Sequence, residues 1–278
     1  MSQVGSVALV TVAFNSDQAL QTLVASWNTN QPNGTVVVVD NAPTASEWLA
    51  SAPPQVQAIF RPDNPGYGGA INAAVAALPA SVESILICNP DVELSPGSVE
   101  RLVESLREQP GVAAVGPRIV DETGATYPSA RAVPSLGIGV GHALLHHVWP
   151  RNPWTRAYHA RNEATAARPC GWLSGACLLV RRRAFESIGG FDERYFMYFE
   201  DVDLGYRLGL AGWINWYEPS VSVVHTGAHS TRNLARVMRA AHHESAKRFI
   251  RARYPHWWQA PLRGFVTWAL EARKRLGR

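Results

Sequence analysis

Cysteine, charged residues and long apolar runs are all scarce in this chain. Its three cysteines are an odd number without CxxC spacing, which argues against a disulfide framework and against a zinc knuckle. No segment offers the roughly 20 consecutive apolar residues that a membrane-spanning helix needs. The amino-terminal MSQVGSVALV has no basic residue before its apolar run, so we expect no secretory signal and a cytoplasmic protein. With 278 residues, 46% of them hydrophobic, the chain is long enough for one sizeable core.

The few charges are distributed unevenly. Residues 228–278 contain 12 Lys and Arg against two Glu, a net charge near +10, while the rest of the chain has 14 basic and 20 acidic residues. This tail also contains Trp257, Trp258, Phe265 and Trp268, and basic residues mixed with aromatic ones favour a membrane surface as the partner. Because positive charge is confined to the tail and the front is acidic, we expect no nucleic-acid partner.

The front half of the chain has the pattern of an α/β fold. Short apolar, β-branched runs at 7–14, 35–40, 56–60 and 84–88 predict buried strands, and they alternate with predicted helices at 17–28, 70–77 and 95–109, the second of them after the turn-rich PDNPGYGG. This alternation indicates a mostly parallel sheet with helices on both faces. Beyond it the sequence predicts strands at 112–120, 172–180 and up to His225, helices at 182–188 and 202–210, and two closing helices.

The segment at 121–169 has no clear periodicity, so we interpret it as an irregular loop or insertion. Arg131 and the pair His146-His147 lie in it, and it could cover a bound ligand or touch a lipid. The domain organisation that follows is a large domain over 1–230 and basic, aromatic helices over 231–278.

Polar residues follow three of the predicted strands: Asn15, Asp40-Asn41 and Asn89-Pro90-Asp91. In an open α/β sheet, ligands bind beyond the carboxyl ends of the strands. A carboxylate there can accept a hydrogen bond from a base or ribose, but beside a diphosphate it requires a divalent cation between them. The alternative interpretation of each residue alone is a loop or cap position.

Three carboxylates crowd the segment Phe199-Glu200-Asp201-Val202-Asp203-Leu204. At helical spacing Glu200 and Asp203 share a face, while Asp201 is rotated by about 100° and can point elsewhere. A helix amino terminus keeps such carboxylates anionic, which is the state that a general base needs. Simple capping of the helix at 202–210 is the alternative.

Two further signals are weak when taken alone. The run Gly66-Tyr67-Gly68-Gly69 looks like a phosphate-binding loop, but it lacks the Walker lysine and the GxGxxG spacing. It could equally be a flexible turn into a closely packed helix. His225 ends an apolar strand, where an imidazole can bind a metal ion or serve a purely structural role.

The combination of these segments resembles the family-2 glycosyltransferases of the GT-A fold, which has a Rossmann-like sheet. The resemblance covers residues 6–230 and consists, in chain order, of VALVTVAFN, VVVVDNA, NPGYGGAINAAV, LICNPDVEL, LSGACLLVRRRAFESIGGFDERYFMYFEDVDLGYRLGLAGW and VVHTGAHS. NPD and FEDVDL with the intervening GGFDE are the most specific of them.

The resemblance assigns roles to individual residues. It implies that Asp91, the last carboxylate of the family's DxD motif, binds Mn²⁺ or Mg²⁺ together with His225, and that Asp201 is the catalytic base. Asn89 stands where the family has the first Asp of that motif, which leaves less charge for the metal. The implied contacts with the nucleotide-sugar donor are Thr11, Ala13, Asp40, Asn64, Gly68, Gly69, Asn89 and Asp91. The implied acceptor-side residues are Trp172, Ser174, Gly175 and Glu200.

Within the family the chain is most similar to bacterial rhamnosyltransferases of the cell-wall linkage unit, in NPDVEL, FEDVDL and HHESAKRFIRARYP…APLR. This likeness implies inverting transfer of L-rhamnose from dTDP-L-rhamnose to the 3-hydroxyl of N-acetylglucosamine on a polyprenyl diphosphate. A lipid-linked acceptor suits a tail that lies on the inner face of the cell membrane. The tail's apolar helix face is Leu262, Phe265, Val266, Ala269 and Leu270, opposed by Arg263, Lys274 and Arg278. A helix that docks on the protein's own core is the alternative.

Other functions have weaker support. A nucleotidyltransferase predicts a lysine-rich phosphate loop near the amino terminus, and no lysine precedes Lys247. A non-catalytic nucleotide-sensing or membrane-scaffold module predicts damage at NPD, FED or His225, and only Asn89 departs from the family pattern. A glycosyltransferase that uses another nucleotide sugar for polysaccharide synthesis stays open, because donor choice depends on the shape of the pocket.

Overall fold

The computed structural model describes residues 6–134, 166–227 and 235–275. Most of the predicted insertion at 121–169, including His146-His147, therefore lies outside the described residues. The strands are β1 (Ser6–Ala13), β2 (Val36–Asp40), β3 (Val56–Phe60), β4 (Val82–Cys88), β5 (Val92–Leu94), β6 (Val112–Val120), β7 (Thr126–Tyr127), β8 (Ala130–Arg131), β9 (Arg168–Cys170), β10 (Trp172–Leu173), β11 (Cys177–Arg181) and β12 (Ile214–His225). The helices are α1 (Asp17–Asn30), α2 (Glu47–Ala50), α3 (Gly66–Ala77), α4 (Ser98–Glu108), α7 (Arg182–Ser187), α8 (Glu200–Leu210), α9 (Ala235–Arg253), the 3₁₀ turn η2 (Trp257–Gln259) and α10 (Ala260–Arg275).

The main sheet has the order β3-β2-β1-β4-β11-β6-β12-β5. Strands β3, β2, β1 and β4 run parallel, as the alternation of strands and helices predicts. Strand β11 enters antiparallel between β4 and β6, so the complete sheet is mixed. The expected α/β architecture is confirmed, and the carboxyl ends of β1, β2 and β4 meet at one edge.

Helices cover both faces of this sheet because the side chains of its strands alternate between two apolar layers. On β1, Leu9 packs with the apolar side chains of α1 and α4, and its neighbour Val10 packs with those of α3 and α7. All of β2 is buried. A strand covered on both faces becomes an uninterrupted apolar run, which is why VVVV was readable from sequence.

The prediction of one continuous strand at 172–180 is wrong, because Ser174–Ala176 belong to no strand and separate β10 from β11. Strand β10 pairs with β8, whereas β11 pairs with β4. At the break the backbone N–H of Ser174 donates to the Ser129 carbonyl, and the N–H of Ala176 donates to Ser174 Oγ. The chain thus changes partners here, and Gly175 is left outside both strands.

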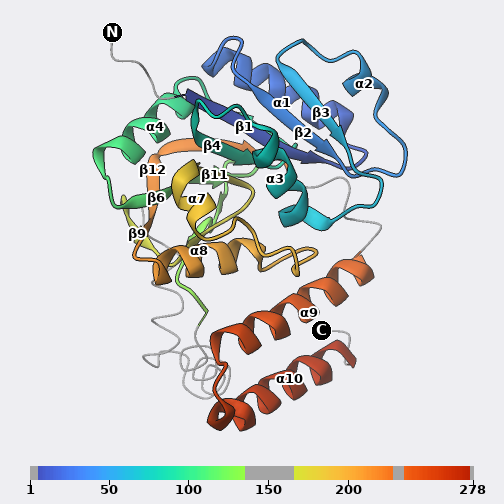
Figure 1. Cartoon of the computed structure of the whole chain (residues 1–278), viewed down its shortest axis with the longest axis vertical. Helices are drawn as coiled ribbons and strands as arrows, with labels where there is room; N and C mark the ends of the chain where they lie inside the picture. Colours follow the sequence, from blue (N-terminus) through green and yellow to red (C-terminus); the bar gives the residue numbers. More distant parts are fainter. Residues whose placement is uncertain (1–5, 135–165, 228–234, 276–278) are drawn as a thin grey trace.

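Helices α9 and α10 form an antiparallel hairpin beside α8 (Figure 1). Phe249 of α9 is fully buried in a small cluster with Trp172, Tyr195 and Val202. The division of the chain at residue 230 remains a prediction about its domains, but α9 is packed into the body that carries the FEDVDL segment. Of the helices in the described part of the chain, none combines the length and hydrophobicity that crossing a bilayer requires.

A matched pair of glycines in α8 tests how closely this helix packs on β10. A Cβ on Gly205 would lie 2.6 Å from Trp172 Cβ, whereas a Cβ on Gly209 meets nothing within 4 Å. We predict that Gly205→Ala lowers the free energy of unfolding by about 1–3 kcal/mol through overpacking. Gly209→Ala should raise it by up to about 1 kcal/mol, because alanine favours a helix.

Urea titration of both variants, with the slope of the transition held constant, measures this difference. Equal stabilities of the two variants would contradict the close contact between α8 and β10.

Candidate active site

The first part of the site lies where β4 and β12 end. Asn89 and Asp91 follow β4 in a tight turn, and β12 pairs with β5 so that His225 lies opposite Val92. His225 Nε2 is 3.1 Å from Asp91 Oδ1 and 3.3 Å from Asn89 Nδ2. Asn89 and His225 are 136 positions apart in sequence, and they meet at one point together with Asp91.

The Asp91–His225 pair has the geometry of two neighbouring metal ligands. Ligands at adjacent corners of a small octahedral ion lie about 3 Å apart, given metal–ligand distances of about 2.1 Å. Asp91 and His225 would be the residues that hold a divalent ion, for which the carboxylate suits Mn²⁺ or Mg²⁺, and this metal role remains a prediction. No group of three or more His, Cys, Asp or Glu within the described residues forms a metal site, so this pair alone holds no closed cage.

The second part of the site is Asp201, at the start of α8. Its Oδ2 accepts from the Gly175 backbone N–H at 3.0 Å and its Oδ1 accepts from the Val202 N–H at 2.8 Å. Burial raises the pKa of Asp201, while these two backbone N–H groups and the charge of Arg131 act in the opposite direction. The hydrogen bonds therefore stabilise the ionised form in a site that otherwise disfavours it.

Glu200 has the opposite environment, although it is the adjacent residue. Its side chain is buried and Oε2 has no hydrogen-bond partner. Burial and the neighbouring carboxylate of Asp201 raise the pKa of Glu200 to about 8. When two buried carboxyls share one site, the proton goes to the one with fewer donors. Asp201, with two backbone donors, is the carboxyl whose ionised form is better stabilised, and its role as the base remains a prediction.

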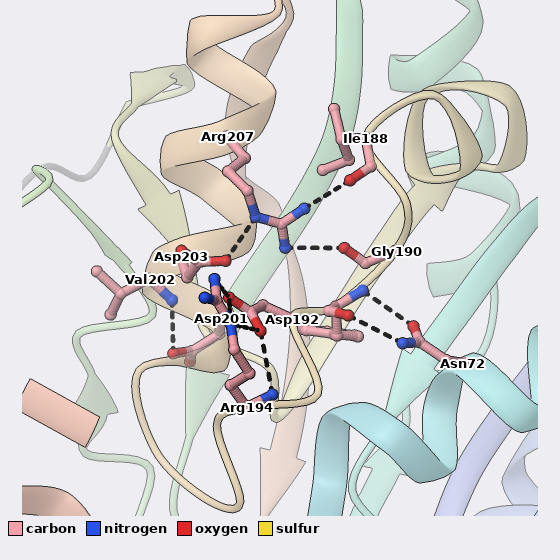
Figure 2. A network of polar contacts seen from close by, with 10 residues as sticks. Asn72, Ile188, Gly190, Asp192, Arg194, Asp201, Val202, Asp203 and Arg207 are labelled. Atoms are coloured by element: carbon pink, nitrogen blue, oxygen red, sulfur yellow. Dashed lines mark hydrogen bonds and ion pairs between the residues drawn. The ribbon is translucent and has the colours of Figure 1, made fainter. Parts of the chain in front are cut away.

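Asp203 is committed to a different network, which Figure 2 shows beside Asp201. Its Oδ2 accepts from Arg207 Nε at 2.5 Å, and the same guanidinium donates to the carbonyls of Ile188 and Gly190. Asp203 therefore orients Arg207, which ties α8 to Ile188 and to Gly190 of the GGFDE loop. The three carboxyl groups of FEDVDL thus have three environments: Glu200 is buried with Oε2 unpartnered, Asp201 has two backbone donors and Asp203 is paired with Arg207.

The loop before α8 is held by α9. Tyr198 and Phe199 have φ of 66° and 67°, in the left-handed region that bulky residues rarely adopt. Ser245 of α9 donates to the Met197 carbonyl at 2.8 Å, and the ring of His242 lies 5.3 Å from that of Phe199. These contacts stabilise a backbone conformation that costs energy. His242 thus contacts the loop that carries the candidate base.

Gly175 and Ala176 connect the two parts of the site. The Asn89 N–H donates to the Ala176 carbonyl at 2.9 Å, and the Gly175 N–H donates to Asp201. The Tyr67 hydroxyl also donates to the Gly175 carbonyl, at 2.7 Å. Gly175 and Ala176 therefore position three parts relative to one another: the turn with Asn89, the carboxylate of Asp201 and helix α3.

Tyr67 is a site residue that sequence reasoning missed. It stands inside the Gly66–Gly69 run, which drew attention only to its glycines. A buried tyrosine normally finds a partner for its hydroxyl, and that expectation is the signal that could have identified it.

The predicted donor residues at the strand ends lie at the expected edge of the sheet. Ala13 pairs with Asp40 in the β1–β2 register, and Thr11 lies two residues earlier on β1. Asp40 accepts from the backbone N–H groups of Ala42 and Ser46, at 3.1 and 2.9 Å. The Oγ1 of Thr11 is buried without a hydrogen-bond partner. Contact of these residues with a donor remains a prediction.

Asn64, Gly68 and Gly69 have packing roles in the protein itself. Asn64 Oδ1 accepts from Asn41 Nδ2 at 3.1 Å and from the Gly66 N–H at 3.3 Å. A Cβ on Gly68 would lie 2.9 Å from Phe191 Cβ, so the glycine lets α3 approach the GGFDE loop. Both features fit the alternative of a closely packed helix start, and donor contact here remains a prediction.

Trp172 and Ser174 shape the other side of Gly175. Both are buried, and Trp172 Nε1 donates to the Ala132 carbonyl at 3.1 Å. The structure thus brings Trp172, Ser174, Gly175, Glu200 and Asp201 together around the break between β10 and β11. Contact with an acceptor remains a prediction for this group.

Comparison with known proteins identifies the family of this chain. Residues 8–189 match the model of the family "Glycosyl transferase family 2". The chain is 43% identical to the N-acetylglucosaminyl-diphospho-decaprenol L-rhamnosyltransferase of Mycobacterium tuberculosis, over 96% of this chain and 91% of the relative. It is 28% identical to the rhamnosyltransferase WbbL of Escherichia coli, over 60% of this chain and 63% of that protein.

Solved structures share the fold at low sequence identity. The mannosyltransferase PcManGT from Pyrobaculum calidifontis, in complex with GDP-Man and Mn²⁺, aligns with a TM-score of 0.59 at 17% identity, over 88% of this chain and 64% of that one. GalNAc-T7 with UDP, GalNAc and Mn²⁺ aligns with a TM-score of 0.59 at 15% identity, over 82% of this chain and 46% of that one. The chain belongs to glycosyl transferase family 2 and is a glycosyltransferase enzyme.

Proposed function

We propose that the enzyme transfers L-rhamnose from dTDP-L-rhamnose to the 3-hydroxyl of N-acetylglucosamine on a polyprenyl diphosphate, in cell-wall assembly. The observation that carries this proposal is the 43% identity, over nearly both full lengths, to a relative named for rhamnose transfer to an N-acetylglucosaminyl-diphospho-decaprenol. The ionised Asp201 beside buried acceptor-side residues supports it.

The proposed reaction is a single inverting displacement. Asp201 removes the proton from the acceptor hydroxyl as its oxygen attacks the anomeric carbon, and the bond from that carbon to the donor diphosphate breaks. The donors to Asp201, from Gly175 and Val202, hold the carboxylate ionised and fix its direction. General-base assistance of this kind contributes about 10²- to 10⁴-fold in rate.

Asp91 and His225 are the residues proposed to hold Mn²⁺ or Mg²⁺. The 3.1 Å between their ligand atoms supports this role. A divalent ion bound there neutralises charge on the departing diphosphate. The amide of Asn89 lies 3.3 Å from the same Nε2 and adds no charge, so a metal ion bound by His225 would displace this contact.

For the nucleotide part of the donor we propose the edge formed by β1, β2 and α3, with Thr11, Ala13, Asp40, Asn64, Gly68, Gly69 and Asn89. The unpartnered Thr11 Oγ1 supports a ligand at the end of β1, since buried hydroxyls are normally hydrogen-bonded.

We further propose that the enzyme is peripheral to the inner face of the cell membrane and binds it through η2 and α10. Their aromatic side chains are unusually exposed: 84% for Trp257, 61% for Trp258 and 66% for Trp268. Arg263 donates to the carbonyls of Tyr254 and His256, so it ties the start of α10 to the end of α9. The side chains of Ala269, Leu270 and Lys274, and residue Arg278, lie outside the part of the structure that is described.

A panel of donors tests the proposed reaction. We expect transfer from dTDP-L-rhamnose to a short-chain N-acetylglucosaminyl diphosphate lipid in the presence of Mn²⁺ or Mg²⁺, and loss of transfer on chelation, because the diphosphate then keeps its charge. Mass spectrometry of the product and the released nucleoside diphosphate measures the outcome. Transfer from a UDP- or GDP-sugar instead would assign the enzyme to another polysaccharide and contradict the rhamnose proposal.

Vesicle binding tests the membrane proposal. The double variant Trp257→Ser with Trp268→Ser should lower co-sedimentation with phosphatidylglycerol vesicles by about tenfold or more, because each aromatic ring buries a large apolar area. Leu210→Ser is the control, since Leu210 is 70% exposed on α8. Turnover of a water-soluble acceptor should not change in either protein. Unchanged sedimentation of the double variant rules out η2 and α10 as the membrane surface.

A further inference from the structure

Arg131 is a charged residue of the irregular segment that the structure places beside the site. It lies on β8, directly opposite Trp172 of β10. Its guanidinium carbon is 5.5 Å from the centre of the Tyr127 ring and 5.5 Å from that of the Trp172 ring. Its Nε donates to the Pro128 carbonyl at 2.8 Å. Two aromatic faces and one hydrogen bond thus fix the plane of the guanidinium.

The two terminal nitrogens of this guanidinium have no partner in the part of the chain that the structure describes. Among residues 6–134, 166–227 and 235–275, none accepts a hydrogen bond from its two terminal nitrogens, and no carboxylate forms an ion pair with it. A guanidinium presents its donors in a planar fork that matches the oxygens of a phosphate. A cation with an oriented, unused fork is therefore suited to bind an anionic ligand.

Arg131 also stands on the acceptor side of the catalytic base. From Trp172 of β10 the chain continues through Ser174 to Gly175, whose N–H donates to Asp201. Burial raises the pKa of Asp201, and the charge of Arg131 acts against that rise, so the two groups are close enough to interact. In the Asp91–His225 pair, Asp91 follows β4 and His225 ends β12, and neither of these strands pairs with β8. Arg131 and the pair proposed to bind the donor diphosphate through a metal ion thus lie on different elements of the fold.

We propose that Arg131 binds the diphosphate of the acceptor and thereby selects a diphosphate-linked sugar over a neutral glycoside. The inference rests on the proposed function. The attacking hydroxyl and the diphosphate are attached to the same sugar ring, so a base that reaches the hydroxyl needs its anion-binding partner about one ring away. Asp201 and Arg131, on either side of Trp172 and Gly175, provide that pair.

The test compares acceptors that differ only in charge. Three acceptors carry the same short alkyl chain on N-acetylglucosamine, through a diphosphate, through a monophosphate or as a neutral glycoside. For the wild type we expect KM to be lowest for the diphosphate. Arg131→Met should raise KM for the diphosphate acceptor by about tenfold to a hundredfold, as expected on losing charge-assisted hydrogen bonds. KM for the neutral glycoside, KM for the donor and kcat should change by less than about twofold when measured on the plateau of the pH profile, where the higher pKa of Asp201 that follows the loss of the Arg131 charge has no effect.

Arg183→Met is the matched control, because Arg183 also lies over an aromatic ring, that of Trp213, 5.5 Å away. Trp213 precedes β12 at the end opposite His225. This variant should leave all three KM values unchanged. Thermal unfolding of both variants checks that they fold, and the wild-type comparison of acceptors stands without any variant.

Three results overturn the inference and leave the proposed function intact. A wild type with equal KM for the diphosphate and the neutral glycoside shows that no anion is recognised. A fall in kcat on all three acceptors, with a shifted acid limb of the pH profile, shows that Arg131 acts on Asp201 instead. An equal rise in KM for the neutral glycoside shows that Arg131 only shapes the pocket. A wild type that turns over none of the three overturns the proposed function, and the inference with it.

Discussion

The hydrogen bond from the Gly175 backbone to the Asp201 carboxylate is the interaction on which this active site depends. A buried carboxylate stays ionised only when donors replace the water it has lost. Gly175 provides one such donor because it lies in the gap between β10 and β11, where no strand partner uses its N–H. The adjacent Ala176 carbonyl accepts from the N–H of Asn89, in the turn that carries Asp91, so one short segment aligns the proposed base with the pair proposed to hold a metal ion.

The rest of the fold supports this arrangement from three directions. Tyr67 of α3 holds the Gly175 carbonyl, and the Asp203–Arg207 pair fixes α8 to the GGFDE loop. Helix α9 stabilises the left-handed backbone at Tyr198 and Phe199. Because α9 continues through η2 into α10, the helices proposed to meet the membrane are physically connected to the loop that carries the base.

The sequence predicted the parts of the fold that are decided locally. Strands buried on both faces are apolar runs, so β1, β2 and β4 were visible from composition, and the polar residues that follow them mark the edge of the sheet. The meeting of Asp91 with His225 followed from family resemblance, since nothing local specifies that β12 pairs with β5. The break at Ser174–Ala176 was missed because the LSGACLLV segment is apolar enough to suggest one continuous strand.

The different roles of the three acidic residues could not be read from FEDVDL either. At helical spacing Glu200 and Asp203 share a face. The arginine that binds Asp203 is local, because Arg207 lies four residues further along the same helix, but the Gly175 N–H that binds Asp201 and the burial that leaves Glu200 Oε2 without a partner depend on tertiary contacts. The packing role of α9 could not be predicted from the sequence for the same reason. Its composition shows a basic helix, whereas the burial of Phe249 depends on a cluster assembled from distant segments.

Turnover by the isosteric variants Asp201→Asn and Glu200→Gln is the most direct test of this account. Asp201→Asn should lose about 10²- to 10⁴-fold in kcat, because an amide cannot accept the proton, while dTDP binding measured by calorimetry with Mn²⁺ stays unchanged. Glu200→Gln should keep most of the wild-type rate, because Glu200 already holds its proton. A near-normal rate for Asp201→Asn, or a loss confined to Glu200→Gln, would contradict the assignment of Asp201 as the base.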